Sequence, residues 1–133
     1  MARRSADPLK RALALLGPLE RRIMHVAWTQ PVSEPFVVHD VHAHMSELAY
    51  TTVMSTMNRL EEKGVLTSRH EKGVRAHKYS VAMSPVEFLD QAGRRQVREV
   101  VDRFGEVALA AFEAHLQGLT AEERDRLRQL GGR

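Results

Sequence analysis

The stretch from Tyr50 to Lys63 gathers side chains that donate hydrogen bonds without adding negative charge to its first turns. At about 100° per residue of an α-helix, its polar and apolar residues separate onto two sides. The polar side holds Thr51, Thr52, Ser55, Asn58 and Arg59. Short hydroxyls let a helix approach closely, donate to phosphate oxygens or base edges, and offer a methyl group to thymine. This chemistry suits a helix that enters a DNA major groove by its N-terminus, where the helix dipole adds partial positive charge.

A basic loop follows this helix. Two strand-like runs, residues 65–69 and 76–81, flank a polar tip that contains Gly73. The potential donors of this hairpin are Arg69, Lys72, Arg75, His77 and Lys78, and its one acid is Glu71. An ordinary surface helix and a solvated loop would explain each feature separately. Together, and in this order, they favour a nucleic-acid surface, because a protruding basic hairpin can straddle a phosphate backbone.

The elements that must position this surface follow from hydrophobic periodicity. Apolar spacing predicts helices over residues 18–29, 38–48 and 50–63, with Phe36-Val37 as a short extended segment and Gly64 as the stop of the third helix. Three helices followed by a two-stranded hairpin is the order of a winged helix-turn-helix. The apolar arc of the third helix should be structural, with Met57 and Leu60 against Trp28 or Ile23; its members are Tyr50, Val53, Met54, Met57 and Leu60.

The last third of the chain is predicted to be entirely helical. Capping boxes start at Ser84 and Thr120, and Gly105 bends or divides the stretch between them. These helices are too few to enclose a core, so their apolar stripe calls for a partner helix, most simply the same stripe on a second copy. The stripe consists of Leu89, Val97, Val100, Phe104, Ala108, Phe112 and Leu116.

The predicted fold class is therefore mainly α with a small β-wing. An N-terminal arm, residues 1–15, contains a short helix capped by Asp7-Pro8. A winged-helix DNA-binding domain follows over residues 16–83, and a helical dimerisation region over residues 84–133.

Composition limits the function classes. The 133 residues include no cysteine and carry a net charge of +3. Residues 1–85 hold twelve Lys and Arg against eight Asp and Glu, whereas residues 86–133 hold eight against nine. A basic first part suits a polyanion partner. Apolar runs are too short to span a membrane, and the region after Arg3-Arg4 is too charged for a secretory signal, so a cytoplasmic protein is expected.

Two other kinds of binding function stay open, whereas an enzyme is not expected. Gly-x-Ser-x-Gly, His-Glu-x-x-His and Gly-rich phosphate-loop motifs are missing from the sequence, so we expect no catalysis and no cofactor. One alternative is a winged-helix module that contacts proteins without binding DNA. The other is a metal-responsive regulator using His39, His42 and His44. On one helix His44 lies about 140° or more from the other two, so a single ion would gather at most two of them.

Several short segments resemble the penicillinase repressor family. They are Leu19-Glu20, Ile23-Met24, Trp28, Val41-His42, Ala49-Tyr50-Thr51-Thr52-Val53-Met54, Asn58-Arg59-Leu60, Lys63-Gly64 and Arg75-Ala76-His77-Lys78-Tyr79. The resemblance implies a homodimeric winged-helix repressor that binds a dyad-symmetric operator in double-stranded DNA and dimerises through its C-terminal helices. It implies DNA contacts by Thr51, Thr52, Ser55, Arg59 and Arg75, to which the charge of the hairpin adds Lys72 and Lys78.

Some positions depart from the family pattern. The span from Gly64 to Tyr79 is about two residues longer than the usual wing, with Val74 between Gly73 and Arg75. The cysteine motif of copper-sensing relatives is absent, and Ala111 precedes Phe112 where protease-cleaved members have Asn. No upstream sensor or protease is therefore assigned. Arg59 is expected to reach a phosphate; the alternatives are a guanine contact and a bracing contact to Ser55 or Glu62.

Overall fold

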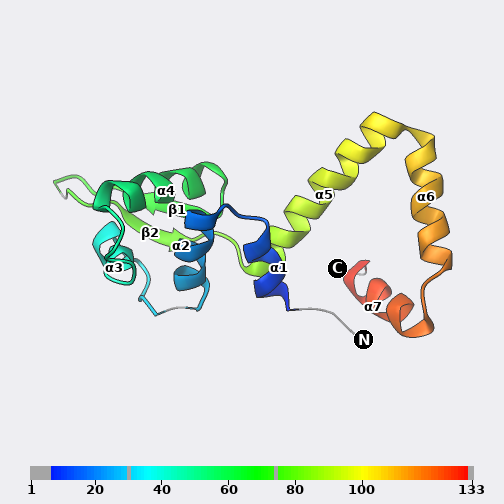
Figure 1. Ribbon diagram of the computed structural model, residues 1–133, viewed down its shortest axis with the longest axis horizontal. Coiled ribbons are helices and arrows are strands. Elements are labelled where there is room, and N and C mark those ends of the chain that lie inside the picture. Colours follow the sequence, from blue (N-terminus) through cyan, green and yellow to red (C-terminus); the bar gives the residue numbers. More distant parts are fainter. Residues whose placement is uncertain (1–6, 30, 74, 132–133) are drawn as a thin grey trace. The chain divides into compact units, whose positions relative to one another are not determined.

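The computed structural model describes residues 7–29, 31–73 and 75–131 (Figure 1). The chain divides into two compact units, residues 1–91 and 92–133, which are described separately below. Val74, which lengthens the predicted wing, and the charged residues Arg3 and Arg4 lie outside the described residues. No helix in the described part of the chain is long and apolar enough to cross a membrane.

The first unit is a winged helix, as predicted. Its elements are α1 (Pro8–Ala14), α2 (Pro18–Thr29), α3 (Val38–His42), α4 (Tyr50–Glu62), β1 (Leu66–Arg69) and β2 (Lys78–Val81). The strands pair antiparallel, from Leu66 opposite Val81 to Arg69 opposite Lys78. Phe36 adds an isolated bridge to Tyr79, through backbone hydrogen bonds of 2.9 and 2.7 Å. The hairpin thus forms a wing beside the helices.

Local rules explain most element ends. The Asp7 carboxylate accepts a hydrogen bond from the Leu9 amide and caps α1 before Pro8. Gly64, at φ +82°, takes the left-handed conformation directly after α4 and its C-cap residue Lys63. The prediction of a helix to Leu48 is wrong, because α3 ends at His42. Beyond His42, the amides of His44, Met45 and Leu48 donate to carbonyls three residues back. Tight turns in this segment therefore follow the same apolar spacing that predicted a helix.

A single hydrophobic core lies beneath these helices and the wing. Its fully buried side chains include Ile23, Met57 and Leu60, which confirms the predicted packing of α4 on α2. Trp28 lies at the core edge, where its indole nitrogen donates to the Met83 carbonyl at 2.8 Å and its ring centroid lies 5.9 Å from that of Phe88. This contact fixes the chain as it enters α5 (Pro85–Phe104).

Helix α4 is turned about its axis relative to the apolar arc read from the sequence. Its buried residues are Val53, Thr56, Met57 and Leu60, whereas Tyr50 is 47% and Met54 39% exposed. At 100° per residue the core-facing direction shifts by about 45°. Thr56 can take a core position because its hydroxyl donates to the Thr52 carbonyl at 2.7 Å. The expectation that Tyr50 and Met54 are structural is therefore wrong.

The second unit contains the end of α5, then α6 (Glu106–Gln117) and α7 (Ala121–Gly131). Both predicted capping boxes are present, Ser84 with Glu87 and Thr120 with Glu123. Gly105, at φ +65°, separates α5 from α6, a conformation that disfavours other residues. Among residues 92–130, Ala108 alone is buried. These helices do not build a core within one chain.

Candidate nucleic-acid interface

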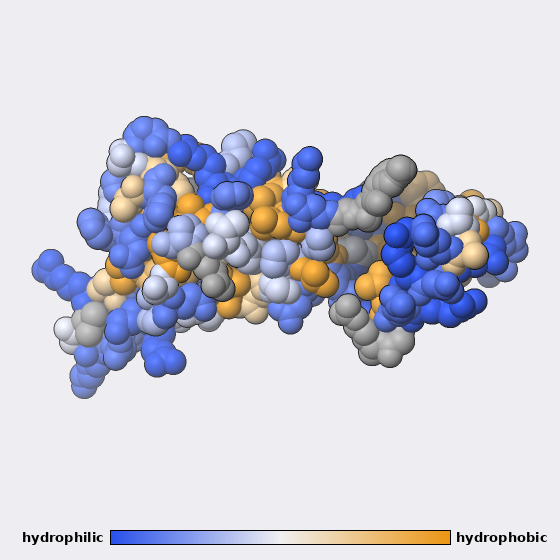
Figure 2. Space-filling model, turned by 90° about the horizontal axis from the view of Figure 1, so that it is seen from below, coloured by the Kyte–Doolittle hydropathy of each residue, from blue (hydrophilic) through white to orange (hydrophobic). Residues whose placement is uncertain are grey.

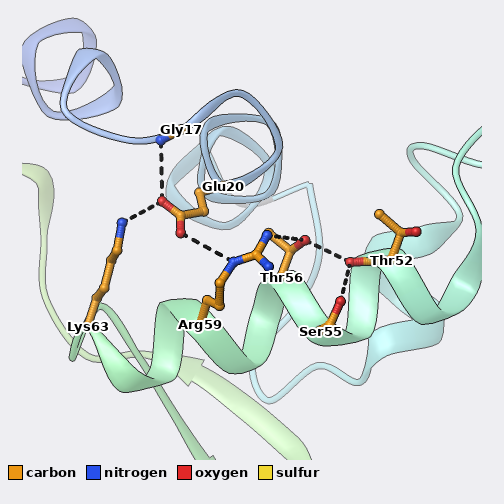
Figure 3. Close-up of polar contacts among 7 residues, drawn as sticks. All are labelled: Gly17, Glu20, Thr52, Ser55, Thr56, Arg59 and Lys63. Carbon is orange, nitrogen blue, oxygen red and sulfur yellow. Dashed lines mark hydrogen bonds and ion pairs between the residues drawn. The ribbon is translucent and has the colours of Figure 1, made fainter.

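The exposed side of α4 centres on Thr51, Ser55 and Asn58. The first turn contains no acidic residue, so the positive end of the helix dipole is not neutralised there. The hydroxyl groups of Ser55 and Thr56 both donate to the Thr52 carbonyl, at 3.3 and 2.7 Å (Figure 3). Thr52 itself is half-buried and lies at the margin of the exposed side. The polar side predicted from the sequence is thus present, with Thr51 nearer its centre than Thr52.

Arg59 lies at the other margin and is held toward α2. Its Nε lies 3.8 Å from Glu20 Oε2, and its Nη2 donates to Thr56 Oγ1 at 3.2 Å (Figure 3). Neither Ser55 nor Glu62, the bracing partners expected from helical spacing, makes this contact. The Arg59 side chain is 55% exposed, so the guanidinium remains accessible to an anion.

Glu20 is the buried anchor of this corner, with only 6% of its surface exposed. Its Oε1 accepts hydrogen bonds from Lys63 Nζ at 2.7 Å and from the Gly17 amide at 3.3 Å. Burial favours the protonated form, but these two hydrogen bonds and the charges of Lys63 and Arg59 outweigh it and lower the pKa of Glu20. Glu20 is therefore a carboxylate that ties the start of α2 to the end of α4.

The cationic side chains of the wing differ in whether an acidic residue neutralises them. Lys78 Nζ lies 2.8 Å from Glu71 Oε1, and this hydrogen bond lowers the pKa of the Glu71 carboxyl. Lys72 and Arg75 are exposed, and no ion pair with a described residue involves either side chain. The rings of His70 and His77 stack with centroids 4.5 Å apart. In Figure 2 the wing tip, at the left end of the view, carries mostly hydrophilic side chains.

A notch of about 180 Å³ lies between α4 and the wing. Tyr50, Met54 and Asn58 line it from α4, while Arg75, His77 and Tyr79 line it from the wing side. The buried Tyr79 hydroxyl donates to Asn58 Oδ1 at 3.1 Å. The sequence placed Asn58 on the polar side of its helix and Tyr79 in a family-like segment, but nothing local indicates that they meet.

Of the three histidines considered for a metal site, His42 contacts other residues of the chain. His42 Nε2 lies 2.8 Å from the Leu48 carbonyl oxygen, and its ring meets Tyr50 edge-on at 5.7 Å. Within the described residues, no group of three or more His, Asp or Glu is arranged to hold a metal ion.

The predicted apolar stripe is mostly open to solvent. Val97, Phe104, Phe112 and Leu116 are exposed, Leu89 and Val100 are half-buried, and Ala108 is buried. Two apolar residues that the stripe did not include, Val107 and Leu109, are more than half exposed. The second unit therefore offers large apolar side chains on more than one side of α6.

The chain is similar in sequence to known transcriptional regulators. A family model described as penicillinase repressor matches residues 16–131. Two curated relatives, each called transcriptional regulator BlaI and coming from the CDC 1551 / Oshkosh and H37Rv strains of Mycobacterium tuberculosis, are 35% identical over 130 residues. The match covers 86% of this chain and 91% of theirs.

Solved structures of regulators also align with the chain. Rv0081 of M. tuberculosis is 22% identical with a TM-score of 0.43, over 74% of this chain and 98% of that one. A MarR/EmrR family transcriptional regulator from Acinetobacter sp. ADP1 is 17% identical with a TM-score of 0.44, over 91% and 87%. At these scores the winged-helix assignment rests on the elements of this chain itself.

Proposed function

Because this chain belongs to the penicillinase repressor family of transcriptional regulators, we propose that it acts as a homodimeric repressor on a dyad-symmetric DNA operator. The observation that carries the proposal is the exposed side of α4, where uncharged donors lie beside a wing whose exposed cations outnumber its acid. In this role the chain works in the cytoplasm and catalyses no reaction.

In the proposed complex α4 enters the major groove by its N-terminus. Thr51, Thr52 and Ser55 face base edges, because their short side chains do not hold the helix away from the groove. Lys72, Arg75 and Lys78 of the wing meet phosphates. Lys72 and Arg75 contribute more than Lys78, because Glu71 already neutralises Lys78 at 2.8 Å.

Arg59 is proposed as a further phosphate contact. Its distance of 3.8 Å to Glu20 is that of an ion pair without a hydrogen bond, whereas Lys63 bonds the same carboxylate at 2.7 Å. Lys63 therefore neutralises Glu20 more closely, and the charge of Arg59 remains available at the exposed margin of α4. A phosphate contact there would release a counterion.

Dimerisation is proposed to use the second unit. Its apolar side chains are exposed and its helices bury almost nothing within one chain, so a second copy supplies the missing apolar surface. A two-fold dimer presents two copies of α4 to two half-sites about one helical turn, or a multiple of it, apart. Linking the half-sites raises affinity without any new contact.

The test combines selection of binding sites from random DNA with the salt dependence of affinity. A repressor of this kind should select inverted half-sites, and its log affinity should fall steeply with log salt. Light scattering should find a dimer at micromolar concentration. Absence of any selected site, together with a flat salt dependence, would instead identify a winged-helix module for protein contacts.

A further inference from the structure

The notch between α4 and the wing lies where a DNA strand must pass if the proposed function is correct. With α4 in the major groove and the wing against the neighbouring backbone, one sugar–phosphate strand runs between the two elements. We infer that Asn58 donates a hydrogen bond to a phosphate of that strand, and that Tyr79 is the positioning residue that aims it. The inference rests on the proposed function and adds two residues to it.

The orientation of Asn58 carries the argument. Its Oδ1 accepts the hydrogen bond of the Tyr79 hydroxyl at 3.1 Å, and the Tyr79 ring is held in the core beside Phe36, 6.4 Å between centroids. The Asn58 Nδ2 group, with two donors, makes no hydrogen bond to a described residue and belongs to an exposed side chain. A rigid buried group thus turns the amide so that it offers donors to the outside.

The charge of the notch selects the acceptor. Arg75 and His77 line it from the wing, and none of its lining residues is acidic. Phosphate oxygens only accept hydrogen bonds, so they match amide donors beside a guanidinium. The exposed Tyr50 and Met54 supply an apolar wall against which a deoxyribose can pack.

The same geometry disfavours the usual base contact of asparagine. Reading adenine requires both the amide oxygen and the amide nitrogen, in a bidentate pair. The Tyr79 hydroxyl takes one lone pair of Asn58 Oδ1 and ties the amide oxygen to the wing, so the inferred contact with DNA uses the Nδ2 donors. Asn58 therefore supports affinity for DNA of any sequence and does not choose among bases.

Gel-shift titration of the full chain on its selected site and on random DNA tests the inference. Asn58→Ala should weaken both kinds of DNA alike by roughly three- to tenfold, and Asn58→Asp by more, because a carboxylate repels the phosphate. The salt slope should stay unchanged in Asn58→Ala, since a neutral donor displaces no counterion. Arg75→Ala should lower that slope by about one unit. Thr67→Ala is the matched control, because Thr67 is exposed on β1 and lies outside the notch.

Tyr79→Phe tests the positioning role, because it removes one hydroxyl and keeps the buried ring. It should reproduce most of the loss seen in Asn58→Ala, and the double variant should lose little more. Affinities of Asn58→Ala and Thr67→Ala within twofold of each other, with salt-dependent binding by the unaltered chain, would overturn the inference and leave the proposed function standing. Fully additive losses would overturn the role of Tyr79. An unaltered chain that binds no DNA would overturn both proposals.

Discussion

Replacing Glu20 by Gln should lower stability and raise DNA affinity at the same time. The substitution keeps the shape of the side chain and its acceptor for the Gly17 amide, but removes the negative charge shared by Lys63 and Arg59. The two effects have opposite signs, because the carboxylate stabilises the corner between α2 and α4 while it neutralises cations beside the DNA surface.

The structure limits the size of each effect. A hydrogen bond to a charged group contributes about 1.5–3 kcal/mol when shielded, and exposed ion pairs contribute about 0–1 kcal/mol. Glu20 is buried, but the side chains of Lys63 and Arg59 are 47% and 55% exposed, so water screens the pairs and rehydrates the released cations. We therefore expect a loss of about 1–2 kcal/mol and a salt slope steeper by up to about one unit.

Thermal or urea denaturation of both chains across pH gives a sharper readout. The pKa of Glu20 is lowered from its ordinary 4.5 in the folded chain, so its stabilisation is fully present above pH 4.5 and lost as pH falls through the folded value. The gap between the original chain and the Gln variant should therefore close below pH 4.5. Other lowered carboxyls, such as Glu47 and Glu123, occur in both chains and cancel.

An equal stability gap at pH 7 and pH 3 would refute the reasoning, because it would show that the charge of Glu20 is irrelevant. A Gln variant with unchanged stability and a weaker affinity for DNA would refute the claim that Glu20 competes with DNA for the charge of Arg59. In that case the role of Glu20 would be to aim Arg59, and its charge would support DNA binding.

Three further outcomes can be checked separately. Leu60→Ala should cost about 2–5 kcal/mol in denaturation, since Leu60 is fully buried, and should leave the DNA affinity of the folded chain unchanged. Lys72→Ala should lower the salt slope on any DNA by about one unit, and Lys78→Ala by less, because Glu71 already neutralises Lys78; equal slopes would contradict the ranking. Phe112→Asp should shift sedimentation toward the monomer at micromolar concentration, whereas Glu113→Gln should not; a dimer in both would move the interface away from the exposed side of α6.

Local chemistry made much of the fold predictable. Ser84 and Thr120 predict helix starts, because each has a Glu three residues later. Gly64 predicts a helix end, because glycine tolerates a positive φ. The order of three helices and a hairpin followed from periodicity together with the polar, Gly-bearing tip between the two strands. The length of α3 did not, since tight turns and helical turns can place Val41 and Met45 equally well in a core.

The candidate site was predictable in its composition and less so in its orientation. Periodicity counts Thr56 as polar, but a hydroxyl that donates to its own helix can be buried, and this turns Tyr50 and Met54 outward. The partners of Arg59 and Asn58 come from distant segments, Glu20 and Tyr79, which helical spacing cannot reveal. These contacts decide which cations and donors are free, so the roles of individual residues needed the structure.

Residues 92–130 bury almost no side chains within one chain, so in the proposed dimer the folding of these helices depends on the concentration of the chain. Helices as short as α6 and α7 are marginal in water without an apolar face to cover. In the proposed dimer their folding is coupled to association, so mass action governs both together. At low concentration α6 and α7 would unfold and their backbone would be open to proteolysis. At high concentration dimerisation would protect them. Repression would then begin above a threshold rate of synthesis, and the lifetime of the dimer would increase with the concentration of the chain.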